Sequence, residues 1–484
     1  MSDKVLKFVE REREMPEKLA PETRRENWDE VYRRFAREKA GAQAGRCSQC
    51  GVPFCQVHCP LHNNIPDWLM LTAEGRLQEA YEVSSATNTF PEMCGRICPQ
   101  DRLCEGNCVI EQSGHGTVTI GAIENYITMT AFEEGWVKPI TPRHERDESV
   151  GIVGAGPGGL AAADMLRRRG YKVHVYDRYD RVGGLLIYGI PNFKLEKEVV
   201  NRRAQLLVDG GIEFHLNTAI GEDISFAELR EKHDAILIAT GVYKPREVEL
   251  PGAGLENVLH AMDYLTASNR KGLGDTVPAF EDGTLDANGK NVVVIGGGDT
   301  AMDCVRTAIR QGAKSVKCLY RRDRGNMPGS QREVTNAEEE GVEFIWLSAP
   351  EAFLGNAGEG VTGVRAQKMR LGPPDSSGRQ SPEPIADSSF TIEADMVIKA
   401  LGFDPEDLPE MFGEPDLTVS RWGTIKADFH TGMTAMPGVF AAGDIVRGAS
   451  LVVWAIRDGR DAAAAMHEYI QARMSADAGA QAAE

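Results

Sequence analysis

Eight of the ten cysteines in this chain of 484 residues lie between positions 47 and 108, in two groups of four with short internal spacings. The first group reads C-x2-C-x4-C-x3-C-P and the second C-x3-C-x5-C-x3-C. Their members are Cys47, Cys50, Cys55, Cys59, Cys94, Cys98, Cys104 and Cys108. Thiolates are soft ligands, and closely spaced sets of four select iron–sulfur cores or zinc over hard cations. The sequence therefore predicts a metal-binding domain near its start.

The spacing favours [4Fe-4S] clusters over zinc. Each group packs four thiols into about fifteen residues, whereas a structural zinc site usually pairs two short knuckles that lie a dozen or more residues apart. The first spacing is also close to the C-x2-C-x2-C-x3-C-P run of bacterial two-cluster ferredoxins. A disulfide framework is a third interpretation, but it is typical of small secreted chains.

Composition and charge argue against several classes of function. Residues 1–10 lack the continuous apolar stretch of a signal peptide, and no run of about 18 apolar residues that could span a membrane occurs. A formal net charge of −18 argues against nucleic acid as a partner, because phosphate binding needs a cationic face. We therefore expect a cytoplasmic protein with reduced thiols, and the length allows about three domains.

A different signal begins at residue 149. Residues 149–153 read as a strand, a glycine-rich turn follows, residues 160–169 read as a helix, and residues 173–177 read as a second strand that ends in an acid. The glycines are Gly154, Gly156 and Gly159, and the acid is Asp177. Such glycines allow a tight turn and close approach to a pyrophosphate, while the acid accepts from a ribose hydroxyl. Because all the parts occur in order, we predict a dinucleotide-binding fold rather than an incidental turn.

The arrangement recurs from residue 291. A strand-like segment at 291–295 leads into Gly296-Gly-Gly298-Asp-Thr-Ala301, and a helix and a second strand follow. This strand ends in Arg321 and Arg322 instead of an acid. Paired guanidinium groups attract the 2′-phosphate of NADP, whereas an acid would bond the free 2′-hydroxyl of NAD. The second site is therefore predicted to take NADPH; the alternative is that the two arginines are a solvated strand end.

Two further segments suggest where a flavin lies. Ala239-Thr-Gly241 and Val439-Phe-Ala-Ala-Gly443-Asp444 each place a small residue after a strand-like run, where a cofactor needs close backbone approach. Asp444 also precedes a predicted helix over residues 451–469, which suggests a contact to a ribityl or phosphate group. The alternative is an ordinary acid near a helix start.

In their order and spacing these motifs resemble the family of small (beta) subunits of NADPH-dependent glutamate synthase. The resemblance includes Gly183-Gly-Leu-Leu-Ile-Tyr-Gly-Ile-Pro191 and Trp28-Asp-Glu-Val-Tyr32, and it covers nearly the whole chain. The same architecture is similar to the N-terminal half of dihydropyrimidine dehydrogenase and to subunits of NADPH and ferredoxin oxidoreductases.

The resemblance implies an α/β fold in which an N-terminal helical iron–sulfur domain is followed by two Rossmann-like dinucleotide-binding domains, the NADPH domain being inserted in the FAD domain. The implied ranges are 1–144 for the helical [4Fe-4S]-cluster domain, 145–288 and 396–484 for the two parts of the FAD domain, and 289–395 for the NADPH-binding domain.

The resemblance also implies which residues bind each cofactor. FAD would be bound by Gly154, Ala155, Gly156, Gly159, Asp177, Gly184, Leu186, Gly443 and Asp444, and NADPH by Gly296, Gly298, Asp299, Thr300, Ala301, Arg321 and Arg322. The two cysteine groups would exchange members, so that one [4Fe-4S] cluster is held by Cys47, Cys50, Cys55 and Cys108 and the other by Cys59, Cys94, Cys98 and Cys104.

The implied activity is electron transfer from NADPH through FAD to the two clusters. From there the electrons would pass to a large (alpha) subunit that makes glutamate from glutamine and 2-oxoglutarate. FAD must lie between NADPH and the clusters, because NADPH gives up two electrons together as hydride and a cluster carries one at a time. Hydride transfer needs no acid, base or nucleophile, so no catalytic side chain is predicted.

Two other functions stay open as alternatives. One is a free-standing NADPH:ferredoxin-type oxidoreductase whose acceptor is a small carrier, and the other is a non-catalytic scaffold with zinc in the cysteine groups. Disulfide reductase chemistry is not expected, since only Cys304 and Cys318 lie outside the two groups and both are predicted to be buried packing residues.

Overall fold

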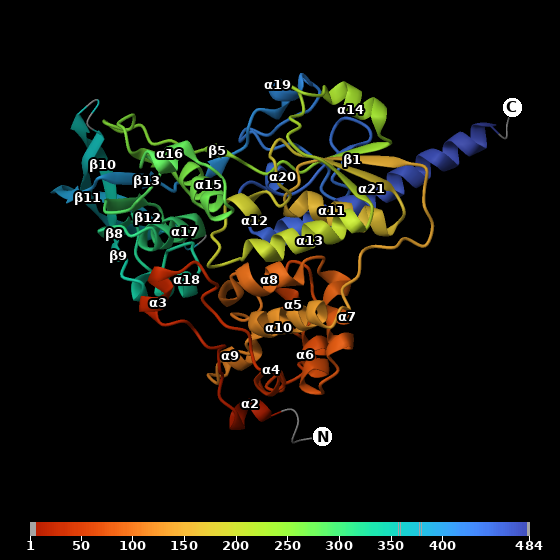
Figure 1. The fold of residues 1–484 in the computed structure, drawn as a ribbon, viewed down its shortest axis with the longest axis horizontal. Helices are drawn as coiled ribbons and strands as arrows, with labels where there is room; N and C mark the ends of the chain where they lie inside the picture. Colours follow the sequence, from red (N-terminus) through yellow and green to blue (C-terminus); the bar gives the residue numbers. More distant parts are fainter. Residues whose placement is uncertain (1–5, 357, 359, 377, 379, 482–484) are drawn as a thin grey trace.

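The computed structural model describes residues 6–481 apart from positions 357, 359, 377 and 379, and it has three main parts (Figure 1). A helical domain from the N-terminal end lies under a first parallel sheet and its helices, and a second parallel sheet stands beside the first. The expected α/β fold, a helical domain followed by two dinucleotide-binding folds, is confirmed.

The helical domain is a bundle of short helices. They are α2 (Lys7–Glu10), α4 (Arg37–Ala44), α5 (Phe54–Val57), α6 (Ile65–Ala73), α7 (Leu77–Thr87), α8 (Pro91–Ile97), the 3-10 turn η1 (Gln100–Arg102), α9 (Val109–Gln112) and α10 (Ile120–Glu133). The helix α3 (Pro21–Glu26) lies apart from the bundle, against the helices of the second sheet (Figure 1). Trp68 and Ile123 are buried in its core. Phe90 and Met93 instead share a core with Leu166 of the next domain, so α8 is the helix that joins the two parts.

The first sheet has five parallel strands in the order β15-β4-β1-β2-β3. Their bounds are Ser149–Val153 (β1), Lys172–Tyr176 (β2), Ile212–His215 (β3), Ala235–Ile238 (β4) and Val439–Ala441 (β15). Its helices are α11 (Pro157–Arg168), α12 (Leu185–Tyr188), α13 (Lys197–Asp209), α14 (Phe226–Lys232), α19 (Leu408–Phe412), α20 (Asp444–Arg447) and α21 (Val452–Gln481). The helices α11 and α21 cross so closely that a Cβ on Gly459 would lie 2.1 Å from the carbonyl oxygen of Gly158.

The second sheet is inserted between β4 and β15. It is parallel, with the order β6-β13-β7-β8-β9 and the bounds Val258–His260 (β6), Met396–Lys399 (β13), Asn291–Ile295 (β7), Ser315–Leu319 (β8) and Glu343–Ile345 (β9). Its helices are α15 (Ala261–Gly272), α16 (Pro278–Glu281), α17 (Asp299–Arg310) and α18 (Gln331–Glu339). We call the part built on the first sheet the first domain and the part built on the second sheet the second domain. The chain leaves the first domain through β5 (Lys244–Pro245) and returns to it through β14 (Phe403–Asp404), and these two strands pair with each other.

The second sheet extends beyond the predicted range of 289–395 on both sides. Strand β13 pairs with β7 in the middle of the sheet, and β6 pairs with β13 at its edge, yet both strands lie outside that range. A short apolar run identifies a strand but not the sheet that it joins, because that choice depends on long-range pairing. Strands β6 and β13 therefore belong to this sheet, although the expected range of 289–395 does not include them.

An antiparallel sheet covers the outer side of the second domain. Its strands are β10 (Ser348–Asn356), β11 (Gly360–Pro374) and β12 (Gln380–Glu393), in that order. Within the described residues, no helix combines the length and the apolar composition needed to cross a membrane.

Candidate functional site

The eight clustered cysteines form two groups in space, and these groups differ from the two groups in the sequence. A small cavity in the helical domain is lined by Cys47, Cys50, Cys55 and Cys108, which we call the outer group. Burial raises the pKa of Cys55 to about 12, and the neighbouring thiols of the same group add to this shift. Burial likewise raises the pKa of Cys47 to about 11.

The inner group consists of Cys59, Cys94, Cys98 and Cys104, close to α8 and the first sheet. A hydrogen bond with Cys94 and burial raise the pKa of Cys98. Burial raises the pKa of Cys59 to about 12, with further contributions from Glu124 and Cys94. All ten cysteines, every one of which lies in the described part of the chain, are free of disulfide bonds.

The chemistry of both groups fits a cationic metal core. Four closely placed thiols that are buried or half-buried repel one another as thiolates, so they need a positive charge at their centre before they can all ionise. Soft sulfur ligands in sets of four are suited to iron–sulfur clusters or zinc. The structure brings together the same two sets of four that the resemblance implies, although the spacing alone would pair Cys59 with the first set and Cys108 with the second.

The first glycine loop has the geometry of a nucleotide cradle. Gly154 has a φ of +110°, and a Cβ on it would lie 2.4 Å from the carbonyl oxygen of Ala239, so only glycine fits. A Cβ on Gly159 would lie 2.0 Å from the carbonyl oxygen of Gly154. No atom lies within 4 Å of a Cβ built on Gly156, the residue before α11, so the helix start faces open space.

Asp177 holds this loop in place. Its carboxylate accepts hydrogen bonds from the backbone N–H of Ala155 at 2.7 Å and from that of Tyr179 at 2.9 Å. Burial raises the pKa of Asp177, and these two donors oppose the shift. An open cavity lined by Gly154, Asp177, Thr240 and other residues reaches this point, so the end of β2 is accessible to a ligand.

The turn at 183–186 lies directly on the glycine loop. Gly184 has a φ of +54°, and a Cβ on it would lie 2.8 Å from the Cα of Gly156. The side chain of Leu186 is buried, and its carbonyl oxygen accepts a hydrogen bond from Nζ of Lys197 at 3.1 Å. The amine of Lys197 also donates to the carbonyl of Ile190. Burial lowers the pKa of Lys197 to about 7. Sequence reasoning missed this lysine, since nothing in a helix sequence marks a buried amine.

The residues at the C-terminal end of β15 shape the other side of this site. Gly443 has a φ of +79° and precedes α20. The carboxylate of Asp444, the first residue of α20, accepts a hydrogen bond from the hydroxyl of Ser450 at 2.6 Å. Burial raises the pKa of Asp444, and Ser450 opposes this shift. The acid therefore stands at the start of the short helix α20 and not at the start of the long helix α21, with which the sequence pattern associates it.

The second glycine loop repeats the geometry of the first. Gly296 has a φ of +150°, and a Cβ on it would lie 2.3 Å from the carbonyl oxygen of Ala400. Gly298 precedes α17 and has open space at its Cβ position. Ala301 is buried under the loop, whereas Thr300 is half-buried.

Arg321 and Arg322 follow β8, as the sequence predicts. Nε of Arg322 donates to the carbonyl oxygen of Gln380 at 3.1 Å, which ties the arginine to the antiparallel sheet. Arg321 is exposed, and among the described residues its guanidinium has no hydrogen bond or ion pair. A free guanidinium at this end of the strand is suited to a phosphate.

A chain of hydrogen bonds connects the inner cysteine group with the second glycine loop. Asp101 lies on η1, between Cys98 and Cys104 in the sequence. Its carboxylate accepts from the hydroxyl of Ser330 at 3.0 Å, and the backbone N–H of Ser330 donates to the carboxylate of Asp299 at 3.0 Å. Two hydrogen bonds therefore lead from the cysteine segment to the start of α17.

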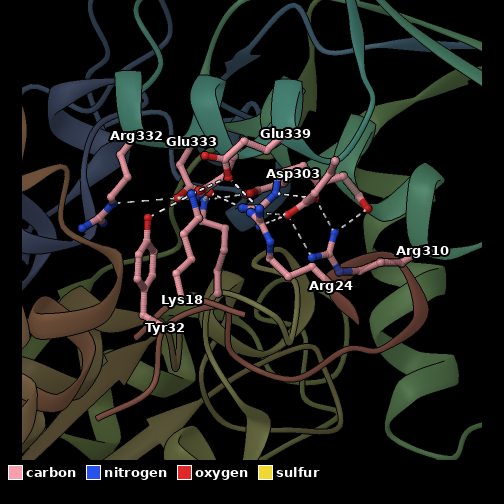
Figure 2. A network of polar contacts seen from close by, with 12 residues as sticks. Lys18, Arg24, Tyr32, Asp303, Arg310, Arg332, Glu333 and Glu339 are labelled. Atoms are coloured by element: carbon pink, nitrogen blue, oxygen red, sulfur yellow. Dashed lines mark hydrogen bonds and ion pairs between the residues drawn. The ribbon is translucent and has the colours of Figure 1, made fainter. Parts of the chain in front are cut away.

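A buried ionic network fastens the N-terminal segment to the second domain. The carboxylate of Glu340 is fully buried and accepts from Arg24 at 3.3 Å, from Arg306 at 2.8 Å and from Arg310 at 2.7 Å. Figure 2 shows the labelled residues of the N-terminal segment reaching toward α17 and α18, namely Lys18, Arg24 and Tyr32. Because buried charges are costly unless they are paired, this contact fixes the position of the segment.

The first domain joins the same network. Nζ of Lys194 lies 2.7 Å from a carboxylate oxygen of Asp303 on α17, and Asp303 is labelled in Figure 2. Burial would raise the pKa of Glu333, but Arg306 and Lys194 outweigh it and lower that pKa to about 2. Paired charges thus hold the second domain against both the N-terminal segment and the first domain.

Comparison with known families agrees with this division of the chain. Residues 24–136 match the family described as dihydropyrimidine dehydrogenase domain II, 4Fe-4S cluster. Residues 148–459 match the family described as pyridine nucleotide-disulphide oxidoreductase. Among solved structures, FprA of Mycobacterium tuberculosis in complex with NADPH has a TM-score of 0.58 at 19% identity, covering 69% of this chain and 86% of that one. This likeness shows that the two proteins share the fold.

Two curated relatives align along almost their entire length. The chain is 66% identical over 475 residues to the glutamate synthase (NADPH) small chain of Azospirillum brasilense, which covers 98% of both proteins. It is 45% identical over 476 residues to the glutamate synthase (NADPH) small chain of Escherichia coli strain K12, covering 97% of this chain and 100% of the relative. The chain therefore belongs to the family of NADPH-dependent glutamate synthase small chains.

Proposed function

We propose that this chain takes electrons from NADPH and passes them through FAD and two [4Fe-4S] clusters to a glutamate synthase large chain. The observation that carries this proposal is the regrouping of the cysteines into two sets of four, each with one buried and three half-buried members. The inner set lies against the first dinucleotide domain and the outer set farther from it. When bound, FAD supplies the change from two-electron hydride chemistry to one-electron transfer.

The first dinucleotide domain would hold FAD. The open space before α11 would receive the diphosphate, and Asp177 would face the adenosine ribose while keeping the loop ordered. Gly443 and Asp444 would lie toward the ribityl side. The contributing residues are Gly154, Ala155, Gly156, Gly159, Asp177, Gly184, Gly443 and Asp444, with Leu186 supporting the turn from within the core.

The second dinucleotide domain would bind NADPH. Its glycine loop offers the same open helix start, and the unpaired guanidinium of Arg321 is available for the 2′-phosphate. The contributing residues are Gly296, Gly298, Asp299, Thr300, Ala301, Arg321 and Arg322. On this assignment the NADPH domain extends from β5 to β14.

Each cysteine group would hold one cluster. The inner group would receive electrons first, because α8 packs in the core of the first domain through Met93 and Cys94. The outer group would follow, since its cavity lies in the separate core of the helical domain. On this order the outer cluster is the last to receive electrons.

The surface around the outer group is suited to docking a protein partner. Val52 is 61% exposed, Phe54 42% and Val57 53%, and all three lie on the segment that carries Cys50 and Cys55. Soluble proteins rarely expose several large apolar side chains together unless the surface binds something. Such a patch beside the last cluster would bring the electron acceptor of the large chain within reach.

Co-expression of this chain with the large chain of the same source tests the proposal. The complex should oxidise NADPH only when glutamine and 2-oxoglutarate are both present. Cys55→Ser should lose about half of the iron and acid-labile sulfide and stop glutamate formation, because one of two cysteine sets is broken. Cys304→Ser, a buried cysteine outside both groups, is the matched control. Full retention of iron in Cys55→Ser, or NADPH oxidation without the two substrates, would contradict the proposal.

A further inference from the structure

Three metal-ligand side chains converge at the edge of the first sheet, outside the cofactor sites. His174 lies on β2, while Glu213 and His215 lie on the edge strand β3. Because Glu213 pairs in register with His174 on a parallel strand, the two side chains share one face of the sheet. His215, two residues along β3, lies on the same face.

The distances between the ligand atoms match a tetrahedral zinc site. Nδ1 of His174 lies 3.2 Å from Nε2 of His215 and 3.3 Å from Oε2 of Glu213. Zinc bonds of about 2.0–2.1 Å place tetrahedral ligands roughly 3.3–3.4 Å apart. The ligand atoms of all three residues lie within 4.8 Å of one another. The side chain of Glu213 is 67% exposed, so its carboxylate is free to move closer to Nε2 of His215.

The neighbouring side chains hold the histidines without competing for the ion. The ring of His233 is tilted against that of His174, with a ring-centre distance of 5.0 Å. Both nitrogens of His233 are engaged, with Ser149 and Tyr176 at 3.0 Å each. The ring of His215 stacks on Tyr176 at 4.5 Å, which fixes its plane. Lys232 is a nearby cation that opposes a metal ion, and the carboxylate of Glu213 offsets its charge.

We propose that His174, Glu213 and His215 bind one Zn²⁺ or another borderline divalent transition ion, with water completing the coordination. Two imidazoles and a carboxylate are ligands that such ions prefer. The ion would cross-link the edge strand β3 to β2. The carbonyl oxygen of His215 accepts from the backbone N–H of Asp177 at 3.0 Å, so this cross-link would also make the end of β2 more rigid.

Metal analysis of the cluster-loaded protein tests the site. The protein is dialysed anaerobically against EDTA and then equilibrated with micromolar Zn²⁺, and zinc and iron are measured together because emptied cysteine groups would also take up zinc. Wild type and the exposed control His430→Gln should bind one equivalent of zinc with unchanged iron. The double variant His174→Gln/His215→Gln should not bind it.

A second variant keeps the test decisive if the double variant fails to fold. Glu213→Gln replaces an exposed side chain, and it should weaken zinc binding by at least about tenfold. Zn²⁺ should raise the thermal denaturation midpoint of the wild type and of His430→Gln, but not that of Glu213→Gln at the same concentration. Equal zinc affinity in Glu213→Gln and wild type, or no zinc in a wild type that retains its iron, would overturn the proposal.

Discussion

The carboxylate of Asp101 lies 3.0 Å from the hydroxyl of Ser330, so a residue between two cysteines of the inner group touches the loop that precedes α18. Asp101 also accepts from the backbone N–H of Gln331 at 3.2 Å, the first residue of α18. The side chain of Ser330 does not cap this helix itself. An acid from the helical domain therefore supplies the N-terminal cap of a helix in the second domain.

Asp101→Ala should lower the thermal denaturation midpoint, because loss of an N-cap costs about 1 kcal/mol. It should also raise the KM for NADPH, since Ser330 holds Asp299 beside the second glycine loop. Differential scanning calorimetry and steady-state kinetics measure the two effects. Asp147→Ala, at an exposed acid that pairs only loosely with Lys172 at 3.5 Å, should leave both values unchanged. Identical behaviour of the two variants would refute the role of the cap.

Glu340→Gln should destabilise the protein strongly. The buried carboxylate is shared by Arg24, Arg306 and Arg310, and breaking a buried ion pair by removing one partner costs about 3–5 kcal/mol. Chemical denaturation followed by fluorescence measures the loss. The matched control is Glu338→Gln on α18, a more exposed acid that pairs with Arg324 at 2.7 Å and should change stability by less than about 1 kcal/mol. A loss in Glu340→Gln no larger than in the control would show that the network contributes little.

Lys197 should make stability depend on pH. Burial lowers its pKa from 10.5 to about 7 in the folded protein, so the unfolded chain binds the proton more tightly. Stability should therefore rise with pH between about 7 and 10, by up to about 1.4 kcal/mol per unit from this group. Denaturation midpoints of wild type and Lys197→Met across pH 7–9 should show a flatter dependence in the variant. Lys314→Met, at an exposed lysine, should follow the wild type, and parallel curves for all three proteins would count against the assignment.

Replacing both arginines after β8 should reduce the preference for NADPH over NADH. Arg321→Ala/Arg322→Ala removes the charged donors proposed for the 2′-phosphate, and such hydrogen bonds contribute about 1.5–3 kcal/mol. The ratio of kcat/KM for NADPH to that for NADH should fall about 10- to 100-fold, mainly through the KM for NADPH. Arg324→Ala, in the same loop but paired with Glu338, should keep the ratio of the wild type. An unchanged ratio in the double variant would place the 2′-phosphate elsewhere.

Local features of the fold follow from the sequence. The strands at 149–153 and 291–295, the glycine loops after them and the arginines after β8 all occur where the motifs predict them. These features depend on short-range chemistry: a tight turn that only glycine tolerates, an apolar strand, and a helix start directly behind the turn. The residue types of the cysteine groups likewise indicate soft-metal chemistry by themselves, because the thiolate is a soft ligand wherever the fold places it.

Tertiary structure alone decided how distant parts meet. By spacing alone each run of four cysteines would share one site, whereas folding places Cys108 with Cys47 and Cys59 with Cys94, as the family resemblance implied. The pairing of β13 with β7, the contact of Asp101 with Ser330 and the burial of Lys197 have no local signal either. Each of these features involves segments that are far apart in the sequence. Packing and loop closure bring such segments together, and both depend on the whole chain rather than on any short stretch of it.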